Sequence, residues 1–181
     1  MGETTTIKQF GLREIAVDGV DEASRKLRFS FMTEAPCDNW FVPEVCLCAK
    51  KNVDLTRFEN GVMPMLFNHN RYIVIGKIEN VSFEDGKVTA EATIDKDEES
   101  EKYFQKILSG SLKGISVGYR RLNTGRVLKG TSYKGLTFDC DMDVTDRWEP
   151  YEISLVSCTA DPDYAVGRGL TNTDMPISIV Q

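Results

Sequence analysis

Alternating apolar and polar residues, the pattern of strands with one buried face, run through most of this chain. The first stretch is Leu27–Phe31, and a run rich in β-branched residues follows at Tyr72–Ile78. Two further stretches, Val81–Phe83 and Val88–Ile94, flank the pair Asp85-Gly86 and so predict a hairpin. Its inward-facing positions are expected to be Val88, Ala90, Ala92 and Ile94.

The clearest alternation covers residues 136–144 and predicts a single half-buried strand. Further strands are expected at Gly114–Arg120 and Tyr151–Ser157. Residues 123–135 are rich in Gly, Thr, Lys and Ser, which is typical of a mobile loop.

One helix is expected after these first strands. Asp95 or Asp97 can cap it, and Gly110 can end it. Its apolar stripe consists of Tyr103, Phe104, Ile107 and Leu108. A shorter helix is expected at Asp54–Phe58. Many short strands with one or two helices predict an α+β domain built on a closed or partly closed, mostly antiparallel sheet.

Composition narrows the class of protein. The chain has 181 residues, of which 41% are hydrophobic and 28% charged, as expected for one globular domain. Its net charge of −6 argues against nucleic acid as the main partner. No apolar run approaches the ~18 residues of a membrane span, and the N-terminus does not resemble a signal peptide. A cytoplasmic protein without a membrane partner is therefore expected.

No metal or cofactor is expected. The five cysteines are an odd number without framework spacing, so reduced thiols are the favoured interpretation. A zinc site at Cys37, Cys46 and Cys48 is conceivable but not favoured, because nothing pairs with them at zinc-site spacing. Residues 139–143 resemble the start of a calcium loop, yet Val144 and Pro150 stand where such a loop needs Gly and Glu.

The candidate chemistry is acyl transfer by a serine. His69 is the only histidine in the chain and therefore the only imidazole base available. Ser116 shares one face of a predicted strand with Gly118, which leaves a nucleophile open to approach. A third group must orient the imidazole. Glu152 is preferred for that role, with Glu149 as the alternative.

Two further points stay open at this stage. Cys158 is an alternative nucleophile, although it follows an apolar strand and is better interpreted as a buried structural thiol. The strand end Gly118–Arg121, or the loop after it, is expected to supply donors to an oxyanion. Arg120 and Arg121 are otherwise interpreted as solvated charges at a strand end.

Three blocks in this order resemble the prohead proteases of tailed bacteriophages. The first is Pro64–Asn70 with Ile75-Gly76-Lys77, the second is Leu112–Tyr119, and the third is Tyr151–Ser157 followed by Ala160–Ala165. The resemblance covers roughly residues 25–168. The chain departs from the family pattern at Asn70, where the family has Asp, and at Thr159–Pro162, where the family has Pro-x-Asn-Pro.

The resemblance implies a fold like that of the herpesvirus assembly proteases, a β-barrel ringed by helices. It implies Ser116 as nucleophile and His69 as base. Because no second histidine exists, it implies the carboxylate Glu152 as third member. The implied substrates are the scaffolding segment of the major capsid protein and the protease itself, inside the assembling prohead in the bacterial cytoplasm. Formation of a homo-oligomer also belongs to this interpretation.

The expected organisation is an N-terminal extension or first strand at 1–24, a protease domain at 25–168 and a flexible tail at 169–181. The alternative from another class is a catalytically silent capsid-assembly or scaffold-binding module with the same fold.

Overall fold

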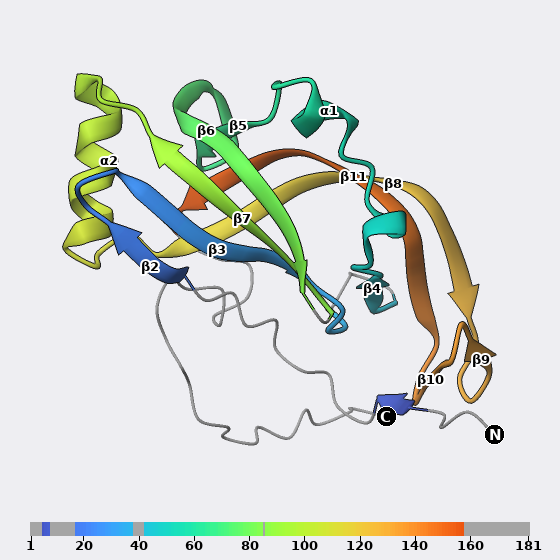
Figure 1. Ribbon diagram of the computed structural model, residues 1–181. Coiled ribbons are helices and arrows are strands. Elements are labelled where there is room, and N and C mark those ends of the chain that lie inside the picture. The colour runs from blue at the N-terminus through green and yellow to red at the C-terminus, as the bar shows by residue number, and fades with distance from the viewer. Residues whose placement is uncertain (1–4, 8–16, 38–41, 85, 158–181) are drawn as a thin grey trace.

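The computed structural model describes residues 5–7, 17–37, 42–84 and 86–157. Strands dominate, and the helices are few and short, which confirms the α+β class (Figure 1). In chain order the elements are β1 (Thr5–Ile7), β2 (Val17–Asp21), β3 (Lys26–Thr33), β4 (Glu44–Cys46), the 3-10 helix η1 (Lys50–Asn52), α1 (Thr56–Glu59), β5 (Pro64–Phe67), β6 (Asn70–Glu84), β7 (Lys87–Ile94), α2 (Glu98–Leu108), β8 (Gly114–Val127), β9 (Ser132–Tyr133), β10 (Leu136–Phe138) and β11 (Met142–Val156).

One large sheet organises the molecule. Its strands follow the order β2-β3-β7-β6-β5-β11-β4, and β8 pairs with β11 outside this path. Most pairings are antiparallel, but β11 pairs in parallel with both β4 and β5. The long strands β8 and β11 run together in a curved arc, while α2 packs at the far end of the sheet (Figure 1). A separate small sheet joins β1, β10 and β9.

The expected closed barrel is wrong for the described part of the chain. Strand β8 pairs only with β11 among the described strands, and β2 pairs only with β3, so no ladder of hydrogen bonds closes the sheet. Strand β11 has neighbours on both edges, β4 and β5 on one and β8 on the other, whereas the outer edge of β8 pairs with no described strand. Strand β8 is therefore a border strand rather than a link back to β2.

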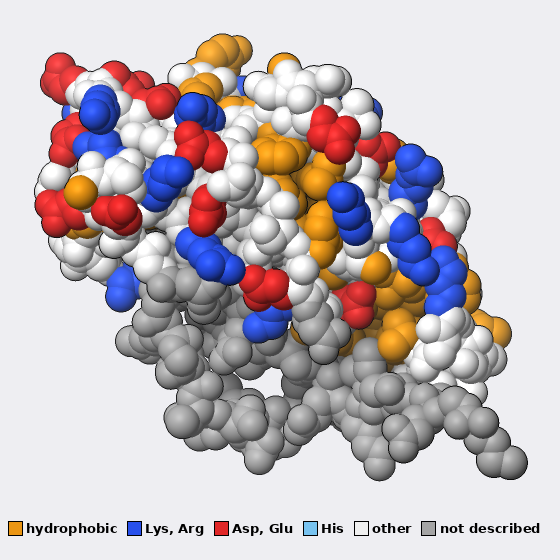
Figure 2. Space-filling view, viewed as in Figure 1, with side chains coloured by type: hydrophobic (Ala, Val, Ile, Leu, Met, Phe, Trp, Pro, Cys, Tyr) orange, Lys and Arg blue, Asp and Glu red, His pale blue; other side chains and the backbone are white. Residues whose placement is uncertain are grey.

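Two apolar clusters fill the interior. The main cluster lies under the large sheet and contains Phe29, Phe31, Met65 and Trp148, which are almost completely buried. The smaller cluster, with Val45, Phe138, Met142 and Val144 among its members, joins the small sheet to the ends of β8 and β11. In Figure 2, apolar side chains appear between the β6–β7 hairpin and the β8–β11 pair, with Lys and Arg along the β8–β11 side.

The strongest sequence patterns are confirmed. The alternation at Leu27–Phe31 lies in β3, and the hairpin β6–β7 buries Val88, Ala90, Ala92 and Ile94 as expected. Helix α2 is capped by Asp97 rather than Asp95, because the Asp97 carboxylate accepts hydrogen bonds from the backbone N–H groups of Glu99 and Ser100. The short helix α1, at Thr56–Glu59, overlaps the expected stretch Asp54–Phe58 but begins two residues later.

Two expectations near residue 130 are wrong. The alternation at 136–144 belongs to two strands in different sheets, because the backbone bends between Phe138 and Met142. The backbone N–H of Lys129 binds the Asp141 carboxylate within that bend. Residues 123–127 are not a loop, since they extend β8 along β11. Residues 158–181, including the expected tail, Cys158 and the Thr159–Pro162 departure, lie outside the described residues.

We predict that Gly76→Ala destabilises the protein, whereas Gly125→Ala does not. A Cβ at Gly76 would overlap the backbone carbonyl oxygen of Thr93 on the paired strand β7, so the strands must separate. Overpacking of this kind costs about 1–3 kcal/mol. A Cβ at Gly125 meets no atom within 4 Å. Urea denaturation of both variants checks this prediction, and an equal loss of stability in the two would contradict it.

Candidate active site

The register between β8 and β11 brings four polar or small residues together on one face of the sheet. Ser116 lies opposite Ser154, and Gly118 lies opposite Glu152. Residues directly opposite each other in an antiparallel pair point to the same face, and so do residues two apart along one strand. Ser116, Gly118, Glu152 and Ser154 therefore lie close together on the same face of the β8–β11 pair.

His69 reaches this face from a tight turn. Strand β5 pairs in parallel with β11, and the two-residue turn Asn68-His69 connects it to β6. Both turn residues have positive φ, 50° for Asn68 and 57° for His69, as a type I′ hairpin turn requires. Asn68 fixes the turn to the end of β11, since its N–H donates to the Leu155 carbonyl at 2.9 Å. Its Oδ1 accepts from the Ser157 N–H, also at 2.9 Å.

The imidazole of His69 lies against the Glu152 carboxylate. His69 Nδ1 and Glu152 Oε1 are 2.6 Å apart. The Glu152 side chain is 7% exposed, whereas that of His69 is 47% exposed. The carboxylate is therefore held inside the protein while part of the ring faces solvent. Nε2, the other ring nitrogen, has no hydrogen-bond partner among the described residues.

Ser116 and His69 line the same pocket. This cavity of about 410 Å³ is lined by Leu66, His69, Arg71, Ser116, Val117, Gly118, Tyr119, Tyr151 and Glu152. Ser116 is half-buried, so its hydroxyl can meet a molecule that enters the pocket. No hydrogen bond joins Ser116 to His69 within the described structure. Catalytic hydrogen bonds are often long in unliganded enzymes and tighten when substrate binds.

Gly118 makes room for the carboxylate. A Cβ at this position would overlap Glu152 Oε1 and would lie 2.6 Å from a ring carbon of Tyr151. Any larger residue would displace Glu152 from His69. The sequence interpretation gave Gly118 the role of opening the approach to Ser116, and the structure gives it this additional one.

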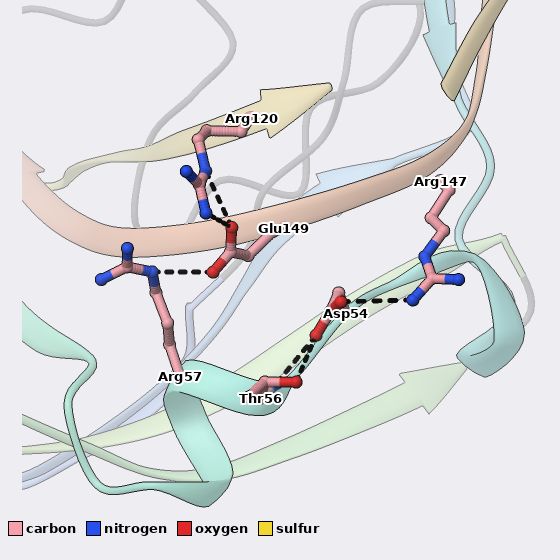
Figure 3. Close-up of polar contacts among 6 residues, drawn as sticks. All are labelled: Asp54, Thr56, Arg57, Arg120, Arg147 and Glu149. Atoms are coloured by element: carbon pink, nitrogen blue, oxygen red, sulfur yellow. Dashed lines mark hydrogen bonds and ion pairs between the residues drawn. The ribbon is translucent and has the colours of Figure 1, made fainter. Parts of the chain in front are cut away.

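Glu149, the alternative carboxylate, lies in a different cluster (Figure 3). Its Oε1 accepts from Arg57 Nε at 2.7 Å, and its Oε2 accepts from Arg120 Nε at 2.8 Å. Arg120, followed by Arg57, holds the pKa of the Glu149 carboxyl below its usual value, in spite of burial. Nearby, Asp54 binds Thr56 and Arg147 (Figure 3). Both Glu149 oxygens are therefore committed to arginines.

A third buried carboxylate, Glu44, contacts Tyr119, one of the residues that line the pocket. Glu44 is 1% exposed, and its Oε2 accepts from Tyr119 Oη at 3.2 Å and from Arg121 at 2.6 Å. The Tyr119 ring also packs edge-on against Trp148. The side chains of Arg120 and Arg121 are exposed, as expected for charges at a strand end, and each is also ion-paired, Arg120 with Glu149 and Arg121 with Glu44. The expectation that Gly118–Arg121 supplies oxyanion donors remains a prediction.

Sequence reasoning missed two groups at this site. Neither Ser154 nor Arg71 was assigned a role from the sequence. The signal for Ser154 was its spacing of two from Glu152 on a predicted strand. No comparable signal marked Arg71, whose place in the pocket depends on the hairpin. Among the described residues, no group of three or more His, Cys, Asp or Glu side chains could hold a metal ion.

Comparison with known proteins bears on this geometry. A family model described as caudovirus prohead serine protease matches residues 47–175, a range that contains His69, Ser116 and Glu152. The chain belongs to the caudovirus prohead serine protease family. This agrees with the resemblance carried by the three sequence blocks.

A curated relative links the family to a capsid protein. The chain is 30% identical over 154 residues to the major capsid protein of Halomonas phage phiHAP-1. The aligned region covers 83% of this chain and 24% of that protein. The chain thus spans about a quarter of the length of this relative.

No solved structure matches the chain at a significant level, so similarity to the herpesvirus proteases is not shown. None of the helices in the described ranges is long and apolar enough to cross a membrane.

We predict that Glu149→Gln weakens the fold in a pH-dependent way. The pKa of this carboxyl is lowered in the folded protein, so its ion pairs stabilise the fold above the usual value of 4.5. This contribution is lost as the pH falls through the lowered pKa. At neutral pH the variant should be less stable by about 1–2 kcal/mol, since both arginines are partly exposed.

Urea denaturation at neutral pH and near pH 3 tests this prediction, and the deficit should shrink at the lower pH. Glu59→Gln, which changes an exposed carboxylate in the neighbouring helix α1, is the matched control and should alter little. A deficit of the same size at both pH values would contradict the assignment.

Proposed function

We propose that this protein is a serine endopeptidase that cleaves the scaffolding region of a phage capsid protein, and itself, during prohead maturation. The observation that carries the proposal is the 2.6 Å contact between His69 Nδ1 and Glu152 Oε1 in the pocket that also contains Ser116. An imidazole, a carboxylate that orients it and an accessible serine are the parts that such catalysis needs. Membership of the prohead serine protease family supports the reaction class.

In the proposed mechanism each group has one task. Ser116 Oγ attacks the carbonyl carbon of the scissile peptide bond while His69 Nε2 takes its proton. The same nitrogen then gives the proton to the leaving amine, and the acyl-enzyme forms on Ser116. Water, activated by His69, hydrolyses this ester and restores the serine. Glu152 accepts a hydrogen bond from Nδ1–H throughout, which fixes the tautomer and stabilises the imidazolium.

The identity of the nucleophile can be argued from burial. Two serines, Ser116 and Ser154, lie opposite each other on the face that His69 approaches. Ser154 is 0% exposed, and its hydroxyl donates to Glu152 Oε2 at 2.7 Å. A fully buried hydroxyl whose proton is directed at a carboxylate cannot attack a substrate. Ser116, half-buried in the pocket, is therefore assigned as the nucleophile.

The proposed substrates are supported by the name of one similar protein. The similar phage protein is named a major capsid protein, which favours a capsid polypeptide and its scaffolding segment as partner. Cleavage would then take place inside the assembling prohead, in the cytoplasm of the bacterial host. Self-cleavage and homo-oligomer formation belong to the same proposal, because assembly concentrates many copies in one shell.

The alternative is a catalytically silent assembly module with this fold. It is favoured by one observation, that the similar region lies within a protein named for its structural role. The two proposals differ in a single measurable outcome, the appearance of cut polypeptide.

We predict that Ser116→Ala and His69→Ala each abolish cleavage. Removal of the nucleophile or base of a catalytic triad lowers the rate by several orders of magnitude. The chain is co-expressed with a phage major capsid protein, and the intact masses of both proteins are compared with and without each substitution. Defined fragments are expected only with the unsubstituted chain.

Undiminished fragments from Ser116→Ala would refute the assigned nucleophile. Fragments from no version, even in the presence of assembled capsid protein, would favour the silent assembly module.

We predict that Glu152→Gln retains weak activity. An amide cannot stabilise the imidazolium and favours the wrong tautomer, so the rate should fall by up to roughly 10⁴-fold. Glu149→Gln is the matched control, since Glu149 lies in the arginine cluster, and it should cleave at the wild-type rate wherever it is folded. A wild-type rate for Glu152→Gln would remove Glu152 from the mechanism.

A further inference from the structure

Ser154 lies directly beneath the proposed catalytic pair and has no assigned role. It is 0% exposed and belongs to β11, two residues after Glu152. Its Oγ accepts a hydrogen bond from the backbone N–H of His69 at 3.1 Å. The same hydroxyl donates to Glu152 Oε2 at 2.7 Å. Its single proton is therefore committed to the carboxylate and its acceptor side to the histidine backbone.

These contacts form a closed ring with the catalytic pair. From the His69 backbone N–H the ring passes through Ser154 Oγ to Glu152 Oε2, and from Glu152 Oε1 back to His69 Nδ1. One carboxylate thus holds the histidine at two points, directly through the ring and indirectly through the main chain. Both oxygens of the buried Glu152 are occupied, so the carboxylate cannot rotate without losing a hydrogen bond. Such a loss is costly in a buried site.

The Ser154 hydroxyl also supports the backbone of the turn that carries His69. A non-glycine residue with positive φ is uncommon and persists only where the surroundings hold it. Asn68 is held by Leu155 and Ser157, but the N–H of His69 itself is held by Ser154. The Ser154 hydroxyl is thus the contact that ties the backbone of the histidine to β11.

We propose that Ser154 is a positioning residue of the peptidase site. Its hydroxyl locks the Glu152 carboxylate and the His69 backbone in one arrangement, so that Nδ1 carries the proton and Nε2 faces the pocket. Because Ser154 is fully buried and is not among the pocket-lining residues, it acts through His69 and Glu152 and does not touch substrate. The inference deepens the proposed function and rests on it for its catalytic consequence.

Removal of this hydroxyl has a specific expected effect. In Ser154→Ala the Oε2 atom of Glu152 and the N–H of His69 both lose their partner, and the imidazole gains freedom to turn. Misplacement of a catalytic group by about 1 Å can cost ~10²-fold in rate. The expected result is a fall in kcat of roughly 10–100-fold with KM unchanged, because the substrate loses no contact.

The single histidine of the chain provides a direct readout. In a ¹H–¹⁵N spectrum of imidazole resonances every signal belongs to His69, so the protonated nitrogen is identified without assignment. For the intact chain the spectrum should show the proton on Nδ1, in a hydrogen bond. Ser154→Ala should show a mixture of the two neutral tautomers and loss of the hydrogen-bonded proton signal.

A matched control is Ser100→Ala, which removes a hydroxyl from an equally buried serine on helix α2, outside the pocket. It should change neither the His69 spectrum nor kcat. If Ser154→Ala does not fold, Ser154→Cys serves instead. It preserves the side-chain shape and replaces a strong donor by a weak one, so the same two changes are expected in smaller measure.

An unchanged His69 spectrum in the folded variant would overturn the positioning role, whatever happens to the rate. A fall in kcat accompanied by an equal change in KM would also overturn it, because it would indicate a disturbed pocket. The spectrum requires no activity. If Ser154→Ala changes the spectrum but the unsubstituted chain never cleaves, the positioning role of Ser154 is supported and the peptidase proposal is refuted. If the unsubstituted chain cleaves but Ser154→Ala leaves the spectrum unchanged, the peptidase proposal is supported and the positioning role is refuted.

Discussion

The pairing of β11 along both edges is the constraint on which the rest of the structure depends. One edge holds β8 and with it Ser116, while the other holds β4 and β5 and with them the turn that carries His69. The strand itself contributes Glu152 and Ser154. Because side chains alternate across a strand, a slip of one residue would send these two to the opposite face. The register of a single strand therefore decides whether the site exists.

The arrangement buries three carboxylates, which is energetically unfavourable unless each has hydrogen-bond partners. Each of the three has such partners. Glu44, Glu149 and Glu152 are all less than a tenth exposed. Glu44 is satisfied by Arg121, Tyr119 and Thr145, and Glu149 by Arg57 and Arg120. Glu152 differs from both, since it binds an imidazole and a hydroxyl but no arginine. The carboxylate proposed to orient the base is thus the one of the three that forms no ion pair with an arginine.

Local patterns predicted the elements well, and long-range pairing explains where they failed. Alternation identified β3 and the β6–β7 hairpin, because burial of one face depends on neighbours along the chain. The same signal misjudged residues 136–144, because apolar residues on both sides of a bend can serve two sheets. Closure of the sheet could not be predicted, since the parallel pairing of β5 with β11 joins segments far apart in sequence.

The contacts that make up the candidate site could be predicted from the sequence only in part, for the same reason. A lone histidine and a serine beside a glycine are visible in the sequence, and the preference for Glu152 over Glu149 followed from alternation. The contacts of Ser154 were not visible, because they depend on the docking of a hairpin 85 residues earlier in the chain. The Ser154 hydroxyl gains the His69 backbone as a partner only when the Asn68-His69 turn packs against β11.

The length of the Asn68-His69 turn has a consequence for how such sequences can diverge. A two-residue turn fixes both the twist of its hairpin and the direction of the imidazole, so an inserted or deleted residue there would carry the base away from the serine. Residues 128–141, which connect β8 to β11, line no part of the pocket that contains Ser116, and their structural role is to build the small sheet and the second apolar cluster. A change in the length of residues 128–141 can therefore leave the pocket in place, whereas a change in the length of the Asn68-His69 turn moves the imidazole out of it.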